Sequence, residues 1–188
     1  MRTFPTFDEI YWFLRQFRPN RGGIQQEYQE ALRLYTEVAC RVPQVIVEIG
    51  TRSGGTAYVM SLAAERFCPR AEIYCVDRNQ DVNKASELEF LRQRMHAIHE
   101  DSPTGLEGVP SPFDLVHIDA SHKSEDIRRD VQAAWGKISP TGIIVLHDWN
   151  KADVRRGATG AIERLRPRPD VQTVTRVTGE WDGQAIIS

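Results

Sequence analysis

The sequence is poor in cysteine and in long apolar runs. Its three cysteines, Cys40, Cys68 and Cys75, are odd in number and form no Cys-x-x-Cys spacing, which argues against a disulfide framework or a zinc knuckle. No apolar run approaches the roughly 18 residues that a membrane span needs. The opening residues, MRTFPTFDEIYWFLRQF, contain acids where a signal peptide would have its apolar centre. We therefore expect a cytoplasmic protein with no membrane partner.

The chain also has little net charge. Its formal net charge is -2, so it has no global positive field to attract nucleic acid, and we expect no nucleic-acid partner. Hydrophobic residues make up 40% and charged residues 27%, which is an ordinary mixture for a globular domain.

Apolar residues at steps of three and four predict two amphipathic helices, at 6–18 and 24–41. Each has one apolar stripe, which must be buried somewhere. We expect residues 1–43 to form a helical segment that acts as a lid or as the interface of a homo-oligomer. A second unit, 44–188, then carries the ligand site.

From Pro43 onward, short β-branched runs alternate with helical periodicity. Strands are predicted at 44–50, 72–77, 95–101, 113–119 and 143–149. Helices are predicted at 56–67, with Phe67 on the inner face, after Asp81, and after a capping Ser124. Pro140-Thr141-Gly142 is interpreted as a turn, Gly157 and Gly160 as part of a loop before a short helix at 161–165, and Asp182-Gly183 as the turn of a hairpin joining 171–177 to 184–188. This order predicts an α/β fold with a doubly wound, mainly parallel sheet and a C-terminal antiparallel hairpin.

The informative positions are the strand ends, because ligands of such sheets bind outside the carboxyl ends of the strands. The first strand runs into Glu48-Ile49-Gly50-Thr51-Arg52-Ser53-Gly54-Gly55, whose glycines allow a tight turn close to a ligand. Asp77 ends the second strand, where a carboxylate can accept hydrogen bonds from ribose hydroxyls. Asp101 ends the third and either contacts an adenine amino group or forms a simple turn. Together these ends favour a nucleoside ligand.

The segments VEIGTRSGGTA, YCVD, HED, FDLVHIDASH and GIIVLHDW resemble a class I S-adenosylmethionine-dependent methyltransferase. The resemblance runs from about Gln44 to Trp149. Within that superfamily the chain resembles the small-molecule O-methyltransferases related to catechol O-methyltransferase, in particular the set that includes antibiotic-sugar O-methyltransferases and cephalosporin hydroxylases. The resemblance implies a seven-stranded Rossmann-like sheet in residues 44–188 and a lid role for the N-terminal helices. It also implies S-adenosylmethionine contacts at Glu48, Gly50, Thr51, Ser53, Gly54, Asp77, Asp101 and Asp119.

The same resemblance implies a metal site. In the catechol-type relatives an Asp after strand four and a pair after strand five hold a divalent cation, and these positions correspond to Asp119 and to His147-Asp148. His122 lies where the relatives have a lysine base, and an imidazole can accept a proton near neutral pH. Histidine suits manganese, iron, nickel or zinc better than magnesium. Three arrangements therefore stay open: a softer metal, a magnesium or manganese ion on Asp119 and Asp148 alone, or no metal.

The resemblance implies an enzyme that methylates a hydroxyl of a small molecule, of a sugar or natural-product type. Alternatives are a non-catalytic nucleoside-binding protein, and a metal-dependent hydroxylase or hydrolase that uses the Asp/His cluster. A nicotinamide-dependent oxidoreductase is disfavoured because G-x-G-x-x-G is missing. The remaining histidines, His96, His99 and His117, are interpreted as core or surface residues of strands. Lys151, Arg155 and Arg156 are interpreted as a solvated charge run, with binding of a phosphate- or carboxylate-bearing acceptor as the alternative.

Overall fold

The computed structural model describes residues 5–17, 23–79, 86–165, 174–177 and 183–188. Within these ranges the chain forms the following elements in order: α1 (Phe7–Arg15), α2 (Tyr28–Arg41), β1 (Val45–Ile49), α3 (Gly55–Phe67), β2 (Glu72–Val76), a 3-10 turn (Ser86–Leu88), α4 (Glu89–Arg92), β3 (Met95–Ile98), a second 3-10 turn (Thr104–Gly108), β4 (Phe113–Ile118), α5 (Ser124–Trp135), β5 (Ile138–Leu146), α6 (Ala152–Leu165), β6 (Val174–Val177) and β7 (Gln184–Ile187).

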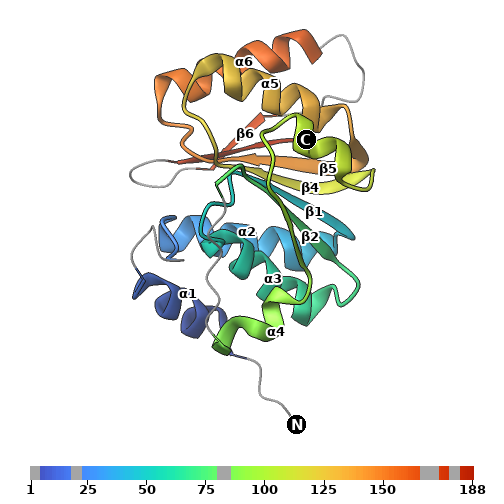
Figure 1. Cartoon of the computed structure of the whole chain (residues 1–188). Helices are drawn as coiled ribbons and strands as arrows, with labels where there is room; N and C mark the ends of the chain where they lie inside the picture. The colour runs from blue at the N-terminus through green and yellow to red at the C-terminus, as the bar shows by residue number, and fades with distance from the viewer. Residues whose placement is uncertain (1–4, 18–22, 80–85, 166–173, 178–182) are drawn as a thin grey trace.

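The strands form one sheet in the order β3-β2-β1-β4-β5-β7-β6. Strands β1 to β5 pair in parallel, whereas β7 runs antiparallel to both β5 and β6. Helices α1 to α4 cover one face of this sheet and helices α5 and α6 the other (Figure 1). The predicted doubly wound, mainly parallel α/β fold is confirmed. Within the described ranges, no helix has the length and apolarity to cross a membrane.

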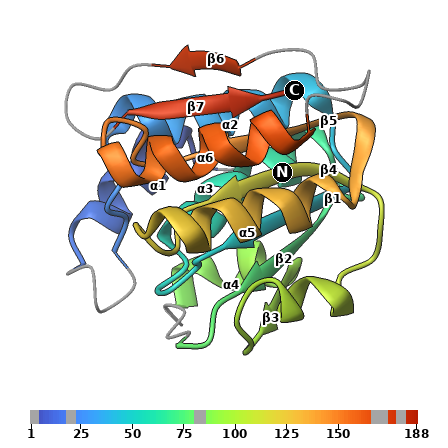
Figure 2. The same cartoon turned by 90° about the horizontal axis from the view of Figure 1, so that it is seen from above.

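Successive residues of the central strands point to opposite faces, and both faces are buried. Val47 and Val116 pack with α5 and α6, whereas Ile46 and Leu115 pack with α2 and α3. The strands were therefore detectable as short, almost uninterrupted β-branched runs. Seen from above, the carboxyl ends of the parallel strands lie along one edge of the sheet, as their common direction requires (Figure 2).

The N-terminal helices pack on the outer side of α3. Phe7, Tyr11 and Leu14 of α1 form a cluster with Tyr58 and Leu62 of α3, so α3 is buried nearly all round. Phe67, predicted on the inner face of its helix, is instead 46% exposed, because it lies in the last turn. The lid role and the homo-oligomer contact expected of residues 1–43 stay predictions.

Several predicted boundaries were wrong. The second helix begins at Tyr28 and not at residue 24, so residues 23–27 lead into α2 as irregular chain with a bend at Gln26. Ser124 does not cap α5: it is the first helical residue, and the N-cap is Lys123. The start of the helix predicted after Asp81 lies outside the described residues, and the part described is only the four-residue α4.

Glycine and proline misled the prediction at two other places. Strand β5 starts at Ile138 and passes through Pro140-Thr141-Gly142, because a register shift in its pairing with β4 accommodates these residues. Gly157 and Gly160 lie inside a 14-residue helix and not in a loop. Gly157 is needed for close packing: a Cβ there would lie 2.3 Å from the backbone oxygen of Ser124 in α5. The predicted hairpin turn falls partly outside the described residues, but β6 and β7 do pair antiparallel.

Candidate active site

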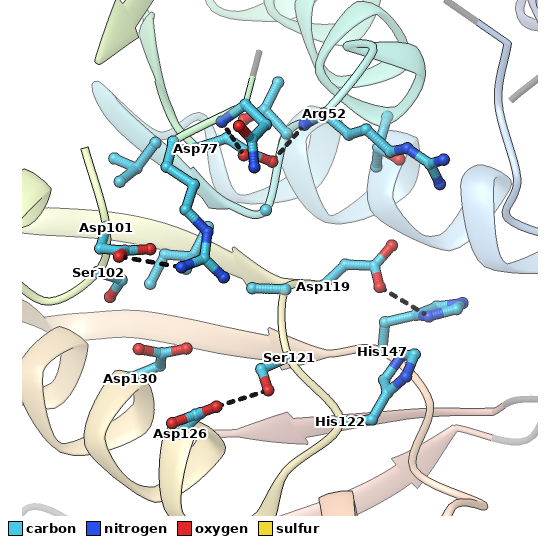
Figure 3. Close-up of a pocket in the computed structure, with 18 of the residues that line it drawn as sticks. Arg52, Asp77, Asp101, Ser102, Asp119, Ser121, His122, Asp126, Asp130 and His147 are labelled. Atoms are coloured by element: carbon cyan, nitrogen blue, oxygen red, sulfur yellow. Dashed lines mark hydrogen bonds and ion pairs between the residues drawn. The ribbon is translucent and has the colours of Figure 1, made fainter. Parts of the chain in front are cut away.

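A cavity of about 940 Å³ lies at the carboxyl edge of the parallel strands. It is centred where β1 and β4 are neighbours and the strand order reverses, the usual ligand position in such a sheet. The turns that follow β1, β2, β3, β4 and β5 all contribute lining residues, and residues 23–26 close one side. Figure 3 shows the labelled side chains converging on this space from several elements.

The glycine-rich turn after β1 forms one wall. Gly50 has φ +93°, and a Cβ there would lie 2.2 Å from the backbone oxygen of Asp119, so only glycine fits between the ends of β1 and β4. Gly54 has φ +81° and forms the N-cap of α3. Of the predicted contact residues in this turn, Gly50, Thr51 and Ser53 line the cavity, whereas Gly54 shapes the turn without lining it.

Asp77, at the end of β2, lies against this turn. One carboxylate oxygen accepts a hydrogen bond from the backbone N–H of Arg52 at 2.7 Å, and the other accepts one from the N–H of Asn79 at 2.8 Å. The carboxylate is thus fixed by the backbone on both sides while it lines the cavity. Each oxygen keeps a further lone pair, which can accept a hydrogen bond from a ligand hydroxyl.

Asp101 also lines the cavity, as predicted from its strand end, but its side chain is 63% exposed and pairs with Arg78 Nη1 at 3.3 Å. Glu48 does not line the cavity. Its side chain is 2% exposed and lies beside His117 Nδ1, 3.2 Å from Glu48 Oε1. Burial raises the pKa of Glu48, and the neighbouring His117 partly offsets this rise.

The pairing of Glu48 with His117 was not foreseen, although a sequence signal existed. The two residues are direct partners in the parallel ladder of β1 and β4, one position before the last residue of each strand. His117 is fully buried, as expected of a core histidine. Its polar partner is what makes that burial tolerable.

The residues after β4 and β5 converge as predicted. His147 Nδ1 lies 3.3 Å from Asp119 Oδ1 and 3.4 Å from Asp148 Oδ1, so the imidazole stands between the two carboxylates. Its other nitrogen, Nε2, lies 3.1 Å from Glu30 Oε2 in α2. Burial alone would lower the pKa of His147, but the three surrounding carboxylates outweigh it and raise the pKa to about 12. The three carboxylates therefore favour the protonated form of His147.

Asp148 is held in a backbone conformation that is rare for a residue with a side chain, with φ +61°. Its Oδ2 accepts a hydrogen bond from Lys151 Nζ at 2.8 Å and lies in contact with His122 Nε2. Burial tends to raise the pKa of Asp148, but His147 and Lys151 outweigh it and lower the pKa. Lys151, interpreted from the sequence as part of a solvated run, thus belongs to the site.

One group of potential metal ligands emerges from the described residues. Asp119, His122 and Asp148 each offer a ligand atom, and these atoms all lie within 4.8 Å of one another. The sequence-predicted set contained His147 in place of His122. The geometry thus groups His122, the expected base, with the two carboxylates. His147 is not in this group, and its Nε2 contacts Glu30.

Two residues from the N-terminal part were missed entirely. Gln26 is 4% exposed; its side-chain amide donates to Asp119 Oδ2 at 2.5 Å and accepts from Thr56 Oγ1 at 2.6 Å. Glu30 is 3% exposed and holds His147. No sequence pattern marks either residue, because a polar side chain next to an amphipathic helix is usually solvated. Ser53 Oγ donates to the backbone oxygen of Gly23 at 3.3 Å, so residues 23–26 are fastened across the glycine-rich turn.

The cavity therefore has two chemically different parts. In one part, around Asp77 and the glycine-rich turn, a ligand can come close to the backbone and donate hydrogen bonds to a carboxylate, which suits a nucleoside. The other, around Asp119, His122 and Asp148, offers acids and bases suited to activating a hydroxyl.

Comparisons with known proteins identify the family and the fold. A family model described as a methyltransferase domain matches residues 47–149. No curated protein matches the sequence. Among solved structures, the chain is similar to an O-methyltransferase from Bacillus cereus in complex with SAH (14% identity, TM-score 0.67, covering 96% of this chain and 89% of the other). It is also similar to the O-methyltransferase TomG from Streptomyces achromogenes, involved in tomaymycin synthesis and bound to SAM (18% identity, TM-score 0.67, covering 96% and 87%). At these identities the likeness establishes the fold.

Proposed function

The chain belongs to the methyltransferase domain family, and we propose that it transfers the methyl group of S-adenosylmethionine to a hydroxyl oxygen of a small molecule. A single observation carries this proposal. One cavity joins a backbone-fixed carboxylate, Asp77, and a glycine-rich turn to a group of acids and bases, Asp119, His122 and Asp148. A nucleoside donor and a hydroxylated acceptor would thus meet in one cavity.

The donor would bind along the turn after β1. The two ribose hydroxyls would donate to Asp77, whose oxygens the Arg52 and Asn79 amides already hold in place. Gly50, which lines the cavity, lets the end of β1 pack directly against the backbone of Asp119 beside this donor site. The amino-acid end of the donor would lie toward Ser53, Thr56 and Gln26, which are buried and line the cavity.

The acceptor hydroxyl would lie beside His122. As the oxygen forms its bond to the methyl carbon, the carbon–sulfur bond breaks with its electron pair left on sulfur, and the hydroxyl proton passes to the His122 imidazole. Asp148, which already pairs with His122, stabilises the imidazolium that results. Gln26 and His147 hold Asp119 from two sides and so orient this part of the cavity.

A divalent cation fits the same residues. Asp119 and Asp148 bring two carboxylates together, and Asp148 Oδ1 is buried without a hydrogen bond of good geometry within the described residues. We propose that these two carboxylates share magnesium or manganese, and that His147 supports them from behind. A cation held there would lower the pKa of a coordinated hydroxyl and orient it for attack. His122, within 4.8 Å of both carboxylates, stays within reach of that hydroxyl.

Calorimetric titration with S-adenosylhomocysteine tests the donor site. We expect binding by the wild type and a loss of about 1.5–3 kcal/mol in Asp77→Ala, because a charge-assisted acceptor is removed. Asp77→Asn, which keeps an oxygen for the Arg52 amide, should lose less. Asp153→Ala is the control, because Asp153 is an exposed acid that does not line the cavity and whose ion pair among the described residues is with Arg156. Binding of a nicotinamide cofactor without S-adenosylhomocysteine, or equal affinity in Asp77→Ala, contradicts the proposal.

Catalysis is tested separately by the formation of S-adenosylhomocysteine in the presence of catechol or sugar acceptors. Activity should disappear with a chelator and return with magnesium or manganese. His122→Gln should lose turnover while it still binds manganese. Loss of manganese binding in that variant would make His122 a ligand and not the proton acceptor.

A further inference from the structure

Asp130 is a buried acid that the mechanism above does not use. It lies in α5, is 4% exposed, and nevertheless lines the cavity. Figure 3 places its carboxyl beside Ser102 and Asp101, on the side of the cavity away from Asp119, His122 and His147. Asp130 therefore faces the part of the cavity that lies beside Asp101 and Ser102 (Figure 3).

The cations near Asp130 are already paired with other acids. Arg129, its neighbour in α5, pairs with Asp126, which also accepts a hydrogen bond from Ser121. Arg78, across the cavity, pairs with Asp101. Among the ion pairs of the described residues, none involves Asp130. A nearly buried carboxylate without a cation is costly, so the group needs either a proton or a ligand.

The surroundings favour the proton. Burial raises the pKa of Asp130 to about 6; the Ser102 hydroxyl and Arg129 offset part of this rise, while the charges of Asp126 and Asp101 add to it. These contributing groups come from α5 itself and from the turn after β3. An uncharged carboxylic acid presents one donor, its O–H, and one acceptor, its C=O.

That pair matches an edge of adenine. Adenine offers an amino donor at N6 next to an acceptor ring nitrogen, which is why the amides of Asn and Gln bind it through two hydrogen bonds. Resting on the proposed function, we propose that Asp130, as a neutral acid, recognises the adenine ring of the methyl donor, donating to a ring nitrogen and accepting from the amino group. Asp101, the residue expected in this role from the sequence, is exposed and paired with Arg78.

Calorimetric titration with S-adenosylhomocysteine, in buffers of different ionisation enthalpy, measures the protons taken up on binding. At about pH 7 the wild type should take up more than about half a proton, because free Asp130 is mostly ionised and bound Asp130 is neutral. Its affinity should weaken with rising pH, by at most about tenfold per unit. Asp130→Asn keeps one donor and one acceptor, so it should bind within about threefold of the wild type at pH 6, without this proton uptake.

Two further variants sharpen the test. Asp130→Leu should bind S-adenosylhomocysteine at least about tenfold more weakly, since it has neither donor nor acceptor. Asp126→Asn, one helical turn away, should retain the proton uptake, because Ser121 and Arg129 keep the pKa of Asp126 low despite some burial. If Asp130→Leu does not fold, the wild type and Asp130→Asn still decide the matter.

The inference is overturned if the wild type takes up no proton, if Asp130→Asn takes up as much as the wild type, or if Asp130→Leu binds as tightly. These results would leave the proposed function intact. Absence of S-adenosylhomocysteine binding at every pH would overturn the proposed function and this inference with it.

Discussion

Gly157 and Gly160 allow a test of how closely α5 and α6 pack. Both glycines lie in the same helix, and replacement by alanine improves the intrinsic helix propensity of each by about 1 kcal/mol. Their surroundings differ. A Cβ at Gly160 meets only Arg128 Cδ at 3.8 Å, an ordinary contact, whereas a Cβ at Gly157 would lie 2.3 Å from the Ser124 backbone oxygen and 3.0 Å from Ile127 Cβ.

We therefore expect the same substitution, glycine to alanine, to change the free energy of unfolding in opposite directions at the two positions. Gly160→Ala should raise the free energy of unfolding by about 0.5–1 kcal/mol. Gly157→Ala must move α6 from α5 by roughly 1 Å, and such overpacking costs about 1–3 kcal/mol. Because the atom met at 2.3 Å is a backbone oxygen that cannot rotate away, the cost should lie at the upper end of this range, about 2–3 kcal/mol. The helix-propensity gain of about 1 kcal/mol leaves a net loss of about 1–2 kcal/mol, or a decrease in Tm of roughly 2–8 °C in a domain of this size.

Urea denaturation followed by circular dichroism measures both variants against the wild type. The denaturant slope m should stay constant, so that the midpoints report stability alone. A Gly157→Ala protein as stable as Gly160→Ala would show that the two helices do not approach as closely as described.

Two further predictions concern acids of the cavity. The pKa of Asp130 is raised above its ordinary value of 3.8 to about 6. Its contribution to the free energy of unfolding is therefore present below about pH 4 and is lost as the pH rises through about 6. The difference of about two pKa units corresponds to about 3 kcal/mol. In urea denaturation, the free energy of unfolding of Asp130→Asn relative to the wild type should therefore increase by up to that amount between pH 4 and pH 8. If the unfolding free energies of the two proteins changed with pH in parallel, the buried environment of Asp130 would be contradicted. Asp148→Ala should abolish methyl transfer but bind S-adenosylhomocysteine nearly as well as the wild type, because Asp148 faces the acceptor and not the donor; a large loss of donor affinity by calorimetry would contradict this placement.

The fold was predictable because strand residues are buried on both faces. The run from Val45 to Ile49 needs no partner to be recognised as a strand, and the alternation of such runs with helices limits the topology to a few arrangements. Glycines were the weak point. Gly54 ends a strand–helix turn and was correctly interpreted as a turn residue. Gly157 instead allows two helices to pack closely, and a glycine in the sequence does not distinguish these two roles.

The candidate site was predictable to the extent that it consists of strand ends. Asp119 and Asp148 follow neighbouring parallel strands, so the fold alone brings them together. Gln26 and Lys151 could not be placed in this way. The first depends on how residues 23–27 cross the glycine-rich turn, and the second on where α6 begins after β5. Such positions follow from tertiary packing and not from a local pattern.

The contact between Glu30 and His147 constrains how this protein can diverge from its relatives. The two residues are buried, 117 positions apart in the chain, and His147 Nε2 lies 3.1 Å from Glu30 Oε2. Loss of either one leaves the other as a buried polar group with one fewer partner, which is destabilising, whereas exchange of both for well-packed apolar residues can be neutral. Among descendants of a common ancestor, we therefore expect positions 30 and 147 to be substituted together, and an amino-acid change at one of them to persist only with a compensating change at the other.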